Sequence, residues 1–300
     1  MKDRRVFLVL AVALAISLAL LPVLGVGCGD EQDTAQDTTT TEAGGEDLAA
    51  IADEAIANVT KSDAITMPPT IKEGVLQAGC DTAFPPFEFS DEAGGYMGFD
   101  VDMVTALSKK MGVEFQIVPT AWDGIIPALV SERYDIIMSA MTITEERKEQ
   151  ISFTDPYIEA NIAITSPVDA PVESAEALAG KVVGVQVDTT GQFAVEEVEG
   201  VKEIKKYDTI LSAFQDLEAG RIEAVVNDAP VNAYIIRDKP KFANTGEIVT
   251  NDVYGFGVKQ QNSELREALN QALQEIKQDG TYEKIFAKWY GAEEAAKAVE

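Results

Sequence analysis

From about Thr70 onward, short apolar runs alternate with segments whose apolar residues recur at helical spacing. Runs of four to seven residues rich in Val, Ile and Phe predict strands, and apolar residues every three or four positions predict helices. Strands are expected at 74–79, 114–120, 134–140, 181–187 and 222–228. Helices are expected at 98–112, 123–134, 144–151, 190–198, 208–220, 229–238 and 263–291. This alternation predicts an α/β fold with mostly parallel sheets.

The chain begins with a different pattern, in which three basic residues precede an apolar run from Val6 to about Gly27. This order is typical of an export signal. The run is also long enough to span a bilayer, so an uncleaved anchor is the alternative. The stretch LGVGCGD resembles a bacterial lipoprotein cleavage site, with 1–28 as signal segment and Cys28 as the lipidated residue, although Gly25 stands where Leu is usual. Either alternative places the remainder outside the cytoplasmic membrane.

Residues 29–69 are rich in Thr, Asp, Glu and Ala, and this composition predicts an acidic, low-complexity linker. Within it, EDLAAIADEAIANV has the apolar spacing of one short helix, which the following Pro pair ends.

Composition and charge exclude several classes of function. The 300 residues carry 51 acidic and 24 basic side chains, a net charge of -27, which argues against a nucleic-acid partner. Histidine is absent from the sequence, so nucleophile–His pairs and His metal sites are excluded. Its two cysteines, Cys28 and Cys80, are too few for a thiolate zinc site. We expect no metal, no cofactor and no catalytic residue.

Polar and aromatic residues gather where the predicted strands end. In open α/β sheets, ligands bind beyond the carboxyl ends of the strands. The residues that follow these ends include two carboxylates, one guanidinium, several hydroxyls and two aromatic rings: Asp81, Phe84, Trp122, Thr142, Arg147, Thr189, Thr190 and Asp228. We consider them candidates for one ligand site.

Most of these residues also have an ordinary structural explanation. Asp228, Thr190 and Thr144 each stand where a helix N-cap is expected. Trp122 and Phe84 are aromatic residues of a kind that commonly packs in cores. Asp81 could close an Asx turn with its neighbour.

Arg147 fits such an explanation least. Thr144 is the expected N-cap of a helix whose first turn holds Glu145 and Glu146, and a capping box would place Glu or Gln at position 147. A cation there opposes the positive end of the helix dipole. A bound carboxylate would compensate, because it pairs with a guanidinium and with the N–H groups at a helix start.

Six segments together resemble one known family. They are DTAFPPFEF, GYMGFDVDMVTALSKKMG, WDGIIPAL, MTITEERKEQISFTDPY, GKVVGVQVDTTGQ and DGTYEKIFAKWYG, in this order. They look like the polar and basic amino-acid-binding proteins of ABC importers, the family 3 solute-binding proteins that include the glutamine, histidine and lysine/arginine/ornithine receptors. The resemblance covers about 70–291.

This resemblance implies a two-lobed periplasmic binding protein type II fold with two hinge crossings. Lobe 1 would comprise 70–157 plus 257–291, lobe 2 would comprise 162–252, and 292–300 would form a C-terminal tail. The segments YIEAN and VYGFG would be the crossings. Closure of the lobes about this hinge would enclose the ligand.

The resemblance also assigns roles to residues. Arg147 would bind the ligand α-carboxylate, assisted by Thr142, the Ala140 backbone and Thr190, and Asp228 would pair with the α-ammonium. Phe84 and Trp122 would enclose the ligand side chain, with Asp81 and Gln186 near its far end.

Gln186 and the aromatic rings favour a basic ligand, because the glutamine receptor has a lysine where this chain has Gln186, and aromatic faces attract cations. Arginine and lysine are expected first, with glutamine and other polar amino acids as the alternative. Asp188, where the family usually has glycine, and the unusual Cys80 leave the side-chain specificity open.

The expected partners follow from the same resemblance. They are a free amino acid and the permease and ATPase subunits of an ABC importer. A monomer is expected, held on the outer face of the cytoplasmic membrane by its lipid anchor or located in the periplasm.

Two other function classes compete with transport. Dehydratases for prephenate or arogenate are similar in fold and would use a pocket carboxylate such as Asp81 or Glu88 as general acid. A sensory domain would continue into a membrane span, whereas this sequence stops at GAEEAAKAVE. The amino-acid clamp favours transport over the dehydratases, and the end of the sequence favours it over a fused sensor.

Overall fold

The computed structural model describes residues 47–248 and 250–298. The predicted signal segment and the predicted lipidation residue Cys28 lie outside these ranges. Among the described residues, every helix is too short or too polar to cross a bilayer.

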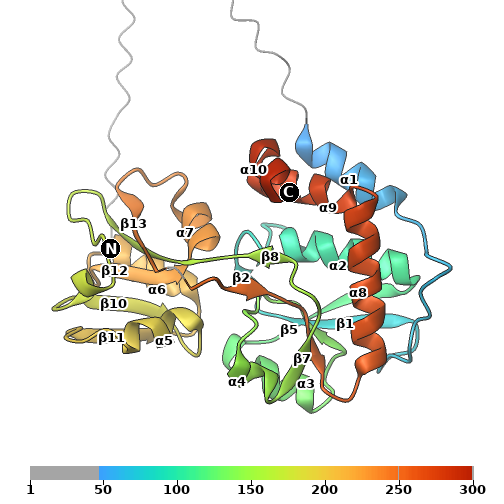
Figure 1. Cartoon of the computed structure of the whole chain (residues 1–300). Helices are drawn as coiled ribbons and strands as arrows, with labels where there is room; N and C mark the ends of the chain where they lie inside the picture. Colours follow the sequence, from blue (N-terminus) through green and yellow to red (C-terminus); the bar gives the residue numbers. More distant parts are fainter. Residues whose placement is uncertain (1–46, 249, 299–300) are drawn as a thin grey trace, which may run out of the picture. The chain divides into compact units, whose positions relative to one another are not determined.

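The first sheet forms the centre of lobe 1 and has the strand order β5-β1-β6-β15-β7 (Figure 1). β1 pairs in parallel with β5 and β6, whereas β15 runs antiparallel to both β6 and β7. The sequence pattern did not predict β7 or β15, and of the five strands only β15 runs opposite to the others. The bounds are β1 (Val75–Cys80), β5 (Glu114–Pro119), β6 (Ile136–Ile137), β7 (Ile151–Phe153) and β15 (Gly257–Lys259).

Helices and a small hairpin sheet complete lobe 1. Helix α2 presents buried Met103, Leu107 and Met111 to the core, and it ends at Gly112, whose left-handed φ of 73° suits glycine. The elements are β2 (Ala83–Phe84), β3 (Glu88–Ser90), β4 (Tyr96–Met97), α2 (Phe99–Met111), η1 (Trp122–Gly124), α3 (Ile125–Val130) and α4 (Glu145–Lys148).

The second sheet forms the centre of lobe 2 and has the order β11-β10-β12-β9-β13. β10 is parallel to β11 and β12, while β9 runs antiparallel to β12 and β13. The bounds are β9 (Ile162–Pro167), η2 (Glu176–Leu178), β10 (Val182–Gln186), α5 (Thr190–Glu196), β11 (Glu203–Tyr207), α6 (Ile210–Glu218), β12 (Ala224–Asp228), α7 (Ala229–Ile236) and β13 (Phe242–Ile248). Two sheets with flanking helices confirm the α/β class.

Two short strands connect the lobes. β8 (Ile158–Glu159) leads from lobe 1 to lobe 2, and β14 (Val253–Tyr254) leads back. They pair with each other in antiparallel register, Val253 opposite Glu159. The chain therefore crosses twice, at the segments YIEAN and VYGFG.

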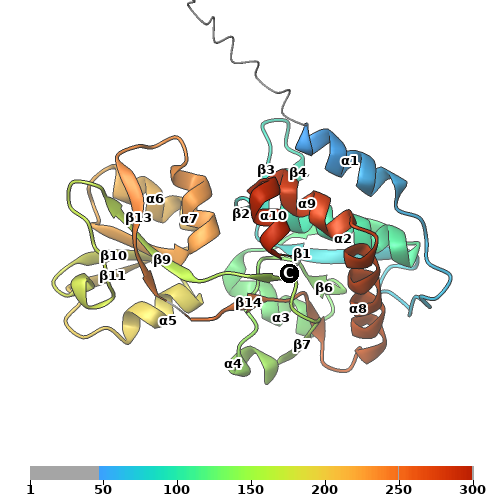
Figure 2. The ribbon, with the colours of Figure 1, turned by 45° about the horizontal axis from the view of Figure 1, so that its top comes forward.

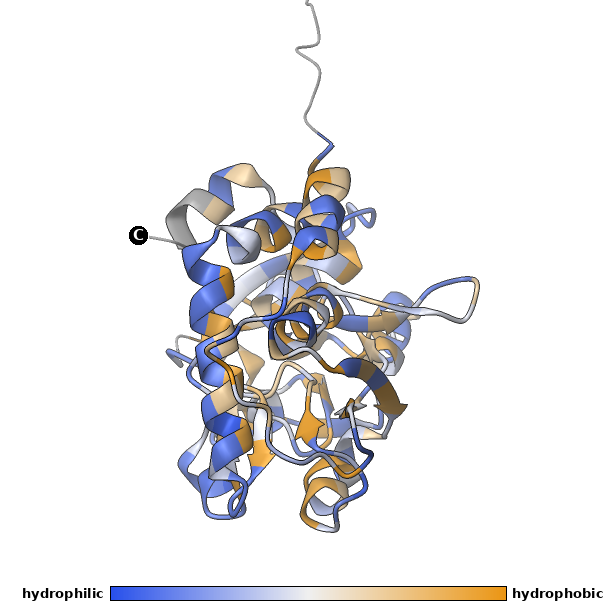
Figure 3. Ribbon diagram, turned by 90° about the vertical axis from the view of Figure 1, so that its right-hand side faces the viewer, coloured by the Kyte–Doolittle hydropathy of each residue, from blue (hydrophilic) through white to orange (hydrophobic). Residues whose placement is uncertain are grey.

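The C-terminal part returns to lobe 1 as α8 (Ser263–Gln278), α9 (Thr281–Tyr290) and α10 (Ala292–Ala298). On α8 the buried residues repeat every three or four positions, and hydrophilic and hydrophobic residues accordingly alternate along the helices on this side (Figure 3). A single helical segment was expected over 263–291, but Gly280 interrupts it with φ 78°, a left-handed conformation that costs glycine little.

Helices lie at both ends of the described chain. α1 (Leu48–Asn58) confirms the short helix expected within EDLAAIADEAIANV, whereas α10 lies within the predicted tail, where no helix was expected. α1 packs beside α9, with Ala52 and Ile56 buried (Figures 1 and 2). Lys288 of α9 binds Asp53 at 2.7 Å and Asp102 at 2.9 Å. The apolar face of α1 therefore makes it part of lobe 1.

Candidate functional site

One cavity gathers the residues predicted from the strand ends. It contains about 300 Å³ of empty space, part of it open to solvent, which is at the small end for ligand sites. All nine residues predicted to bind ligand line it. The complete lining is Asp81, Phe84, Trp122, Ser139, Ala140, Thr142, Arg147, Gln186, Thr189, Thr190 and Asp228.

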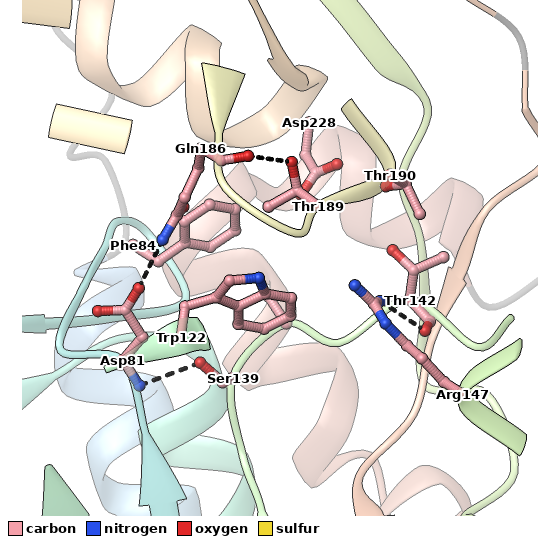
Figure 4. Close-up of a pocket in the computed structure, with 11 residues that line it drawn as sticks. Asp81, Phe84, Trp122, Ser139, Thr142, Arg147, Gln186, Thr189, Thr190 and Asp228 are labelled. Atoms are coloured by element: carbon pink, nitrogen blue, oxygen red, sulfur yellow. Dashed lines mark hydrogen bonds between the residues drawn. The ribbon is translucent and has the colours of Figure 1, made fainter. Parts of the chain in front are cut away.

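Two groups of polar side chains lie at opposite sides of the pocket. In Figure 4, Arg147 and Thr142 lie on one side of the pocket, and Asp81 and Gln186 lie on the other. Trp122 lies between these two groups. Residues of both lobes contribute, since Gln186 ends β10 and Asp228 ends β12.

Arg147 is held at the start of α4, where Thr144 is the N-cap. The Thr144 hydroxyl oxygen accepts a hydrogen bond from Arg147 N at 3.1 Å, so the predicted cap is confirmed. The Arg147 side chain is only 8% exposed. The side chain therefore points into the protein, whereas a charged residue in the first turn of a helix usually faces solvent.

Two carbonyl groups orient the Arg147 guanidinium. Nη1 donates to Thr142 O at 2.9 Å and Nη2 donates to Asp188 O at 3.3 Å. The guanidinium carbon also lies 5.1 Å from the centre of the Trp122 ring. Three of the five N–H donors remain for a ligand. Burial lowers the Arg147 pKa, while the nearby Asp228 carboxylate counteracts that shift.

Asp81 and Gln186 meet across the cleft between the lobes. Gln186 Nε2 donates to Asp81 Oδ2 at 2.9 Å and to Asp208 O at 3.1 Å. Because both partners are acceptors, the amide nitrogen must face them, which leaves the Gln186 Oε1 atom as an acceptor. Burial raises the pKa of Asp81, and the Gln186 hydrogen bond opposes the shift. The Asx turn considered from sequence is not formed, because the Ala83 N–H donates to the Asp81 main-chain oxygen at 2.8 Å and the carboxylate bonds to Gln186.

Asp228 has the N-cap position of α7 but forms no side-chain capping hydrogen bond. Its carboxyl group is instead 7% exposed and lines the cavity. Burial raises the Asp228 pKa to about 7, although the Arg147 guanidinium favours its charged form. The capping explanation is therefore wrong for this residue, and a cationic partner would stabilise its charged form.

Of the two threonines at the start of α5, only Thr189 acts as a cap. Its hydroxyl accepts from Gln192 N at 3.2 Å and donates to Gln186 O at 2.8 Å. Thr190 is the first helical residue and also lines the cavity. The capping explanation considered for Thr190 thus applies to its neighbour.

A set of buried polar contacts supports the wall behind the pocket. Ala140, at a left-handed φ of 42°, donates its backbone N–H to Asp100 Oδ2 at 3.0 Å. Ser139 accepts from Asp81 N at 3.1 Å and donates to Glu88 Oε1 at 2.9 Å. Glu88 and Asp100 are both fully buried, so burial raises both carboxyl pKa values. These contacts fix the backbone that ends β1 and β6.

Family comparison agrees with this geometry. The model of the bacterial extracellular solute-binding proteins, family 3, matches residues 76–292. The chain belongs to this family. The resemblance noted from six sequence segments is confirmed, and the two lobes with two crossings are those of a family 3 protein.

Individual relatives cover most of this family 3 chain. The putative ABC transporter arginine-binding protein 2 of Escherichia coli (strain K12) is 38% identical over 220 residues, 72% of this chain and 90% of that protein. The L-cystine-binding protein TcyJ of the same strain is 31% identical over 253 residues, 83% of this chain and 91% of that protein. A solved structure of an ancestral arginine-binding protein bound to glutamine has a TM-score of 0.71 and 44% identity, covering 73% of this chain and 99% of that chain.

Two further lining residues of the family 3 chain had no ligand role assigned from the resemblance. Thr189, which precedes α5, is among the strand-end candidates, whereas Ser139, two residues after β6, is not. The strand-end criterion could have selected Ser139 as well. Cys80, whose role was left open, is buried, and its thiol pKa is raised by burial. It is not one of the residues that line the cavity.

Proposed function

We propose that this family 3 protein binds a basic amino acid, arginine in particular, outside the cytoplasmic membrane and delivers it to an ABC importer. Arg147 binds the α-carboxylate, with Thr142, Thr190 and the Ala140 backbone as further partners. Asp228 binds the α-ammonium. The relatives named as arginine-binding proteins of ABC transporters support the ligand class and the delivery role.

The main observation behind the proposal is that the end of the pocket formed by Asp81 and Gln186 offers hydrogen-bond acceptors and no free donors. Both Nε2 hydrogens of Gln186 are engaged, so Gln186 and the Asp81 carboxylate offer only acceptors there. A guanidinium brings several donors in a plane, and a lysine ammonium brings three at one point. Phe84 and Trp122 line the same cavity and suit a planar cation.

A neutral head group matches this end less well. Glutamine and citrulline each bring a carbonyl oxygen, which would face acceptors and lose its hydrogen bonds at a cost of about 1–3 kcal/mol. The cystine-binding relative and the glutamine-bound structure make these ligands necessary comparisons. Arginine and citrulline form the most informative pair, because they have the same length and differ in the charge of the head.

Calorimetry with the purified chain tests the ligand. The panel contains arginine, lysine, ornithine, citrulline, glutamine, histidine and cystine. We expect arginine to bind at least about 10-fold more tightly than citrulline. Equal affinities for the two, or tight binding of cystine alone, would contradict the assignment.

Asp81→Asn tests the far end of the pocket. Loss of a charged hydrogen-bond acceptor should weaken arginine binding about 10- to 100-fold and citrulline binding much less. Asp123→Asn removes the same charge from an exposed residue beside Trp122 and serves as the matched control. If Asp81→Asn weakens both ligands equally, Asp81 does not select the cation.

The dehydratase alternative has no specific support in the pocket. Glu88 is fully buried, bonded to Ser139, and is not among the cavity-lining residues. Asp81 is bonded to Gln186. Accumulation of product from prephenate or arogenate with the purified chain would contradict the transport proposal.

The membrane attachment belongs to the same proposal. We propose that Cys28 carries a lipid, which holds a monomeric binding protein on the outer face of the cytoplasmic membrane. Labelling of the expressed chain with a radioactive fatty acid, lost in Cys28→Ser, is the expected result. An unlabelled chain that remains in the membrane fraction would favour the uncleaved anchor.

A further inference from the structure

The loop between β10 and α5 places one backbone oxygen of lobe 2 against lobe 1. Asp188 in this loop has φ 55°, a left-handed conformation that non-glycine residues adopt at a cost. Its own N–H donates to Gln192 Oε1 at 2.9 Å, and the next residue, Thr189, caps α5. The direction of the Asp188 carbonyl is therefore fixed by the helix that follows it.

Two donors from lobe 1 converge on this carbonyl. Trp122 Nε1 donates to Asp188 O at 3.1 Å, and Arg147 Nη2 donates to the same oxygen at 3.3 Å. The Arg147 guanidinium is thus held by one carbonyl from each lobe, Thr142 O in lobe 1 and Asp188 O in lobe 2. Both contacts of Asp188 O require the lobes to be closed.

We propose that Asp188 is a positioning residue whose main-chain carbonyl couples closure of the lobes to the orientation of Arg147 and Trp122. In the open form, Arg147 keeps only the Thr142 carbonyl and can rotate away from the ligand carboxylate. Closure adds the second carbonyl, which fixes the guanidinium and the indole ring together. A ligand that needs both groups in place therefore binds the closed form better and shifts the equilibrium toward it.

This inference rests on the proposed amino-acid ligand, and it requires the left-handed backbone conformation of Asp188. The left-handed residue Asp188 lies between Gln186, which binds Asp81, and Thr190 at the start of α5. A β-branched residue at position 188 resists that conformation by about 1–2 kcal/mol. It should redirect the carbonyl without substituting any of the ligand-contacting residues.

A double-mutant cycle tests the coupling. Trp122→Phe keeps an aromatic ring but removes the N–H donor, and we expect arginine affinity to fall about 3- to 10-fold. Asp188→Val should lower it about 5- to 30-fold. Both changes remove contacts to the same oxygen, so their effects should not multiply. The loss of arginine affinity in the double variant should be at least about 3-fold smaller than the product of the two single losses. A loss equal to the product would overturn the inference.

Matched variants separate positioning from general destabilisation. Glu132 in lobe 1 also has a left-handed φ, 62°, and is exposed. Glu132→Val should lower the melting temperature without changing arginine affinity. Asp188→Asn, which tolerates the left-handed region, should restore binding to within about 3-fold. If Glu132→Val weakens arginine binding as much as Asp188→Val, strain alone explains the effect.

A second measurement keeps this inference distinguishable from the ligand assignment. Small-angle scattering of the ligand-free variants should show a larger radius of gyration for Trp122→Phe and Asp188→Val, and no change for Glu132→Val. If the unsubstituted chain fails to bind arginine, the proposed ligand is wrong. The scattering experiment, which uses no ligand, then tests by itself whether Asp188 favours closure of the lobes. Unchanged radii for both cleft variants would overturn it.

Discussion

The Asp228 carboxyl is a buried acid in a pocket that also contains a buried cation. Its pKa of about 7, raised by burial, means that part of the population is protonated near neutral pH when the pocket holds no ammonium. An α-ammonium within hydrogen-bonding reach would favour the ionised form. Ligand binding should therefore be linked to proton release.

Affinity for an amino acid should rise as the pH increases from 5 to about 7 and level off above it. Below pH 7 the ligand must displace the proton of Asp228, which weakens binding, whereas above pH 7 the carboxylate is already ionised. Calorimetry at pH 6 in buffers of different ionisation enthalpy should detect proton release. Asp228→Asn should remove most of that release, and an unchanged value would contradict the assignment.

Arg147→Ala should weaken binding of every amino acid in the panel at least about 100-fold. The substitution removes the buried guanidinium that we propose as the charged, bidentate partner of the α-carboxylate shared by all these ligands. Lys148→Ala, one residue on and exposed, is the matched control and should bind normally. A ligand whose affinity survives Arg147→Ala would have its carboxylate elsewhere.

At the residue scale, side-chain chemistry was predictable and main-chain chemistry was not. Arg147 was conspicuous because a cation opposes the dipole at a helix start, and it lines the cavity together with all the other predicted ligand residues. The Asp188 carbonyl was not predictable, because any residue type carries a backbone oxygen. Only the fold determines where that oxygen points.

At the scale of elements, α1 is a short helix that depends on its packing. A helix of 11 residues is marginal alone, so its stability comes from the face that carries Ala52 and Ile56. This helix lies before the family match, which begins at residue 76. We therefore expect it to contribute to stability without contributing to ligand binding.

Ala52→Asp should detach α1 from lobe 1. Burying a carboxylate against α9 costs more than a short helix can compensate, so α1 should unfold locally. Hydrogen exchange should show fast exchange over 48–58 and a melting temperature lower by a few degrees, with arginine affinity unchanged. Ala57→Asp places the same charge on the exposed side and should leave exchange slow. Slow exchange in both variants would show that packing of Ala52 is not needed to keep α1 folded.

The alternating pattern predicted the apolar strands better than the short or polar ones. β1, β5, β10 and β12 follow apolar runs that the local sequence reveals. β7 and β15 are three residues long and β13 carries the polar stretch FANTGEI, so their pairing depends on partners far away in sequence. Gly280 could have been predicted to end α8, because a glycine followed by Thr at a new helix start is a common C-cap pattern.

At the scale of the whole molecule, buried carboxyls make folding stability depend on pH. Burial raises the Asp100 pKa to about 7, above the value of about 3.9 for an unfolded chain. Between these values the native state binds more protons than the unfolded state. The free energy of unfolding should therefore decrease as the pH rises from about 4 to 7 and become level above that range.

Asp100→Asn should reduce this slope by up to about 1.4 kcal/mol per pH unit, because one native-state proton no longer titrates. Chemical denaturation of the ligand-free chain at pH 5, 6 and 7.5 measures it. Asp63→Asn changes an exposed carboxyl and should give a curve parallel to that of the unsubstituted chain. Equal slopes for Asp100→Asn and the unsubstituted chain would show that the buried carboxyl is already ionised.

Lobe 2 is an insertion within lobe 1, and this connectivity has a consequence for biosynthesis. All strands of the second sheet lie between Ile162 and Ile248, whereas the first sheet needs β15 at Gly257–Lys259, placed between β6 and β7. All strands of the second sheet are therefore synthesised before the first sheet has its full set. Lobe 1 begins earlier in the sequence, but its sheet lacks the strand between β6 and β7 until β15 has been synthesised. A chain truncated after residue 252 should thus contain a folded lobe 2 attached to an incomplete lobe 1.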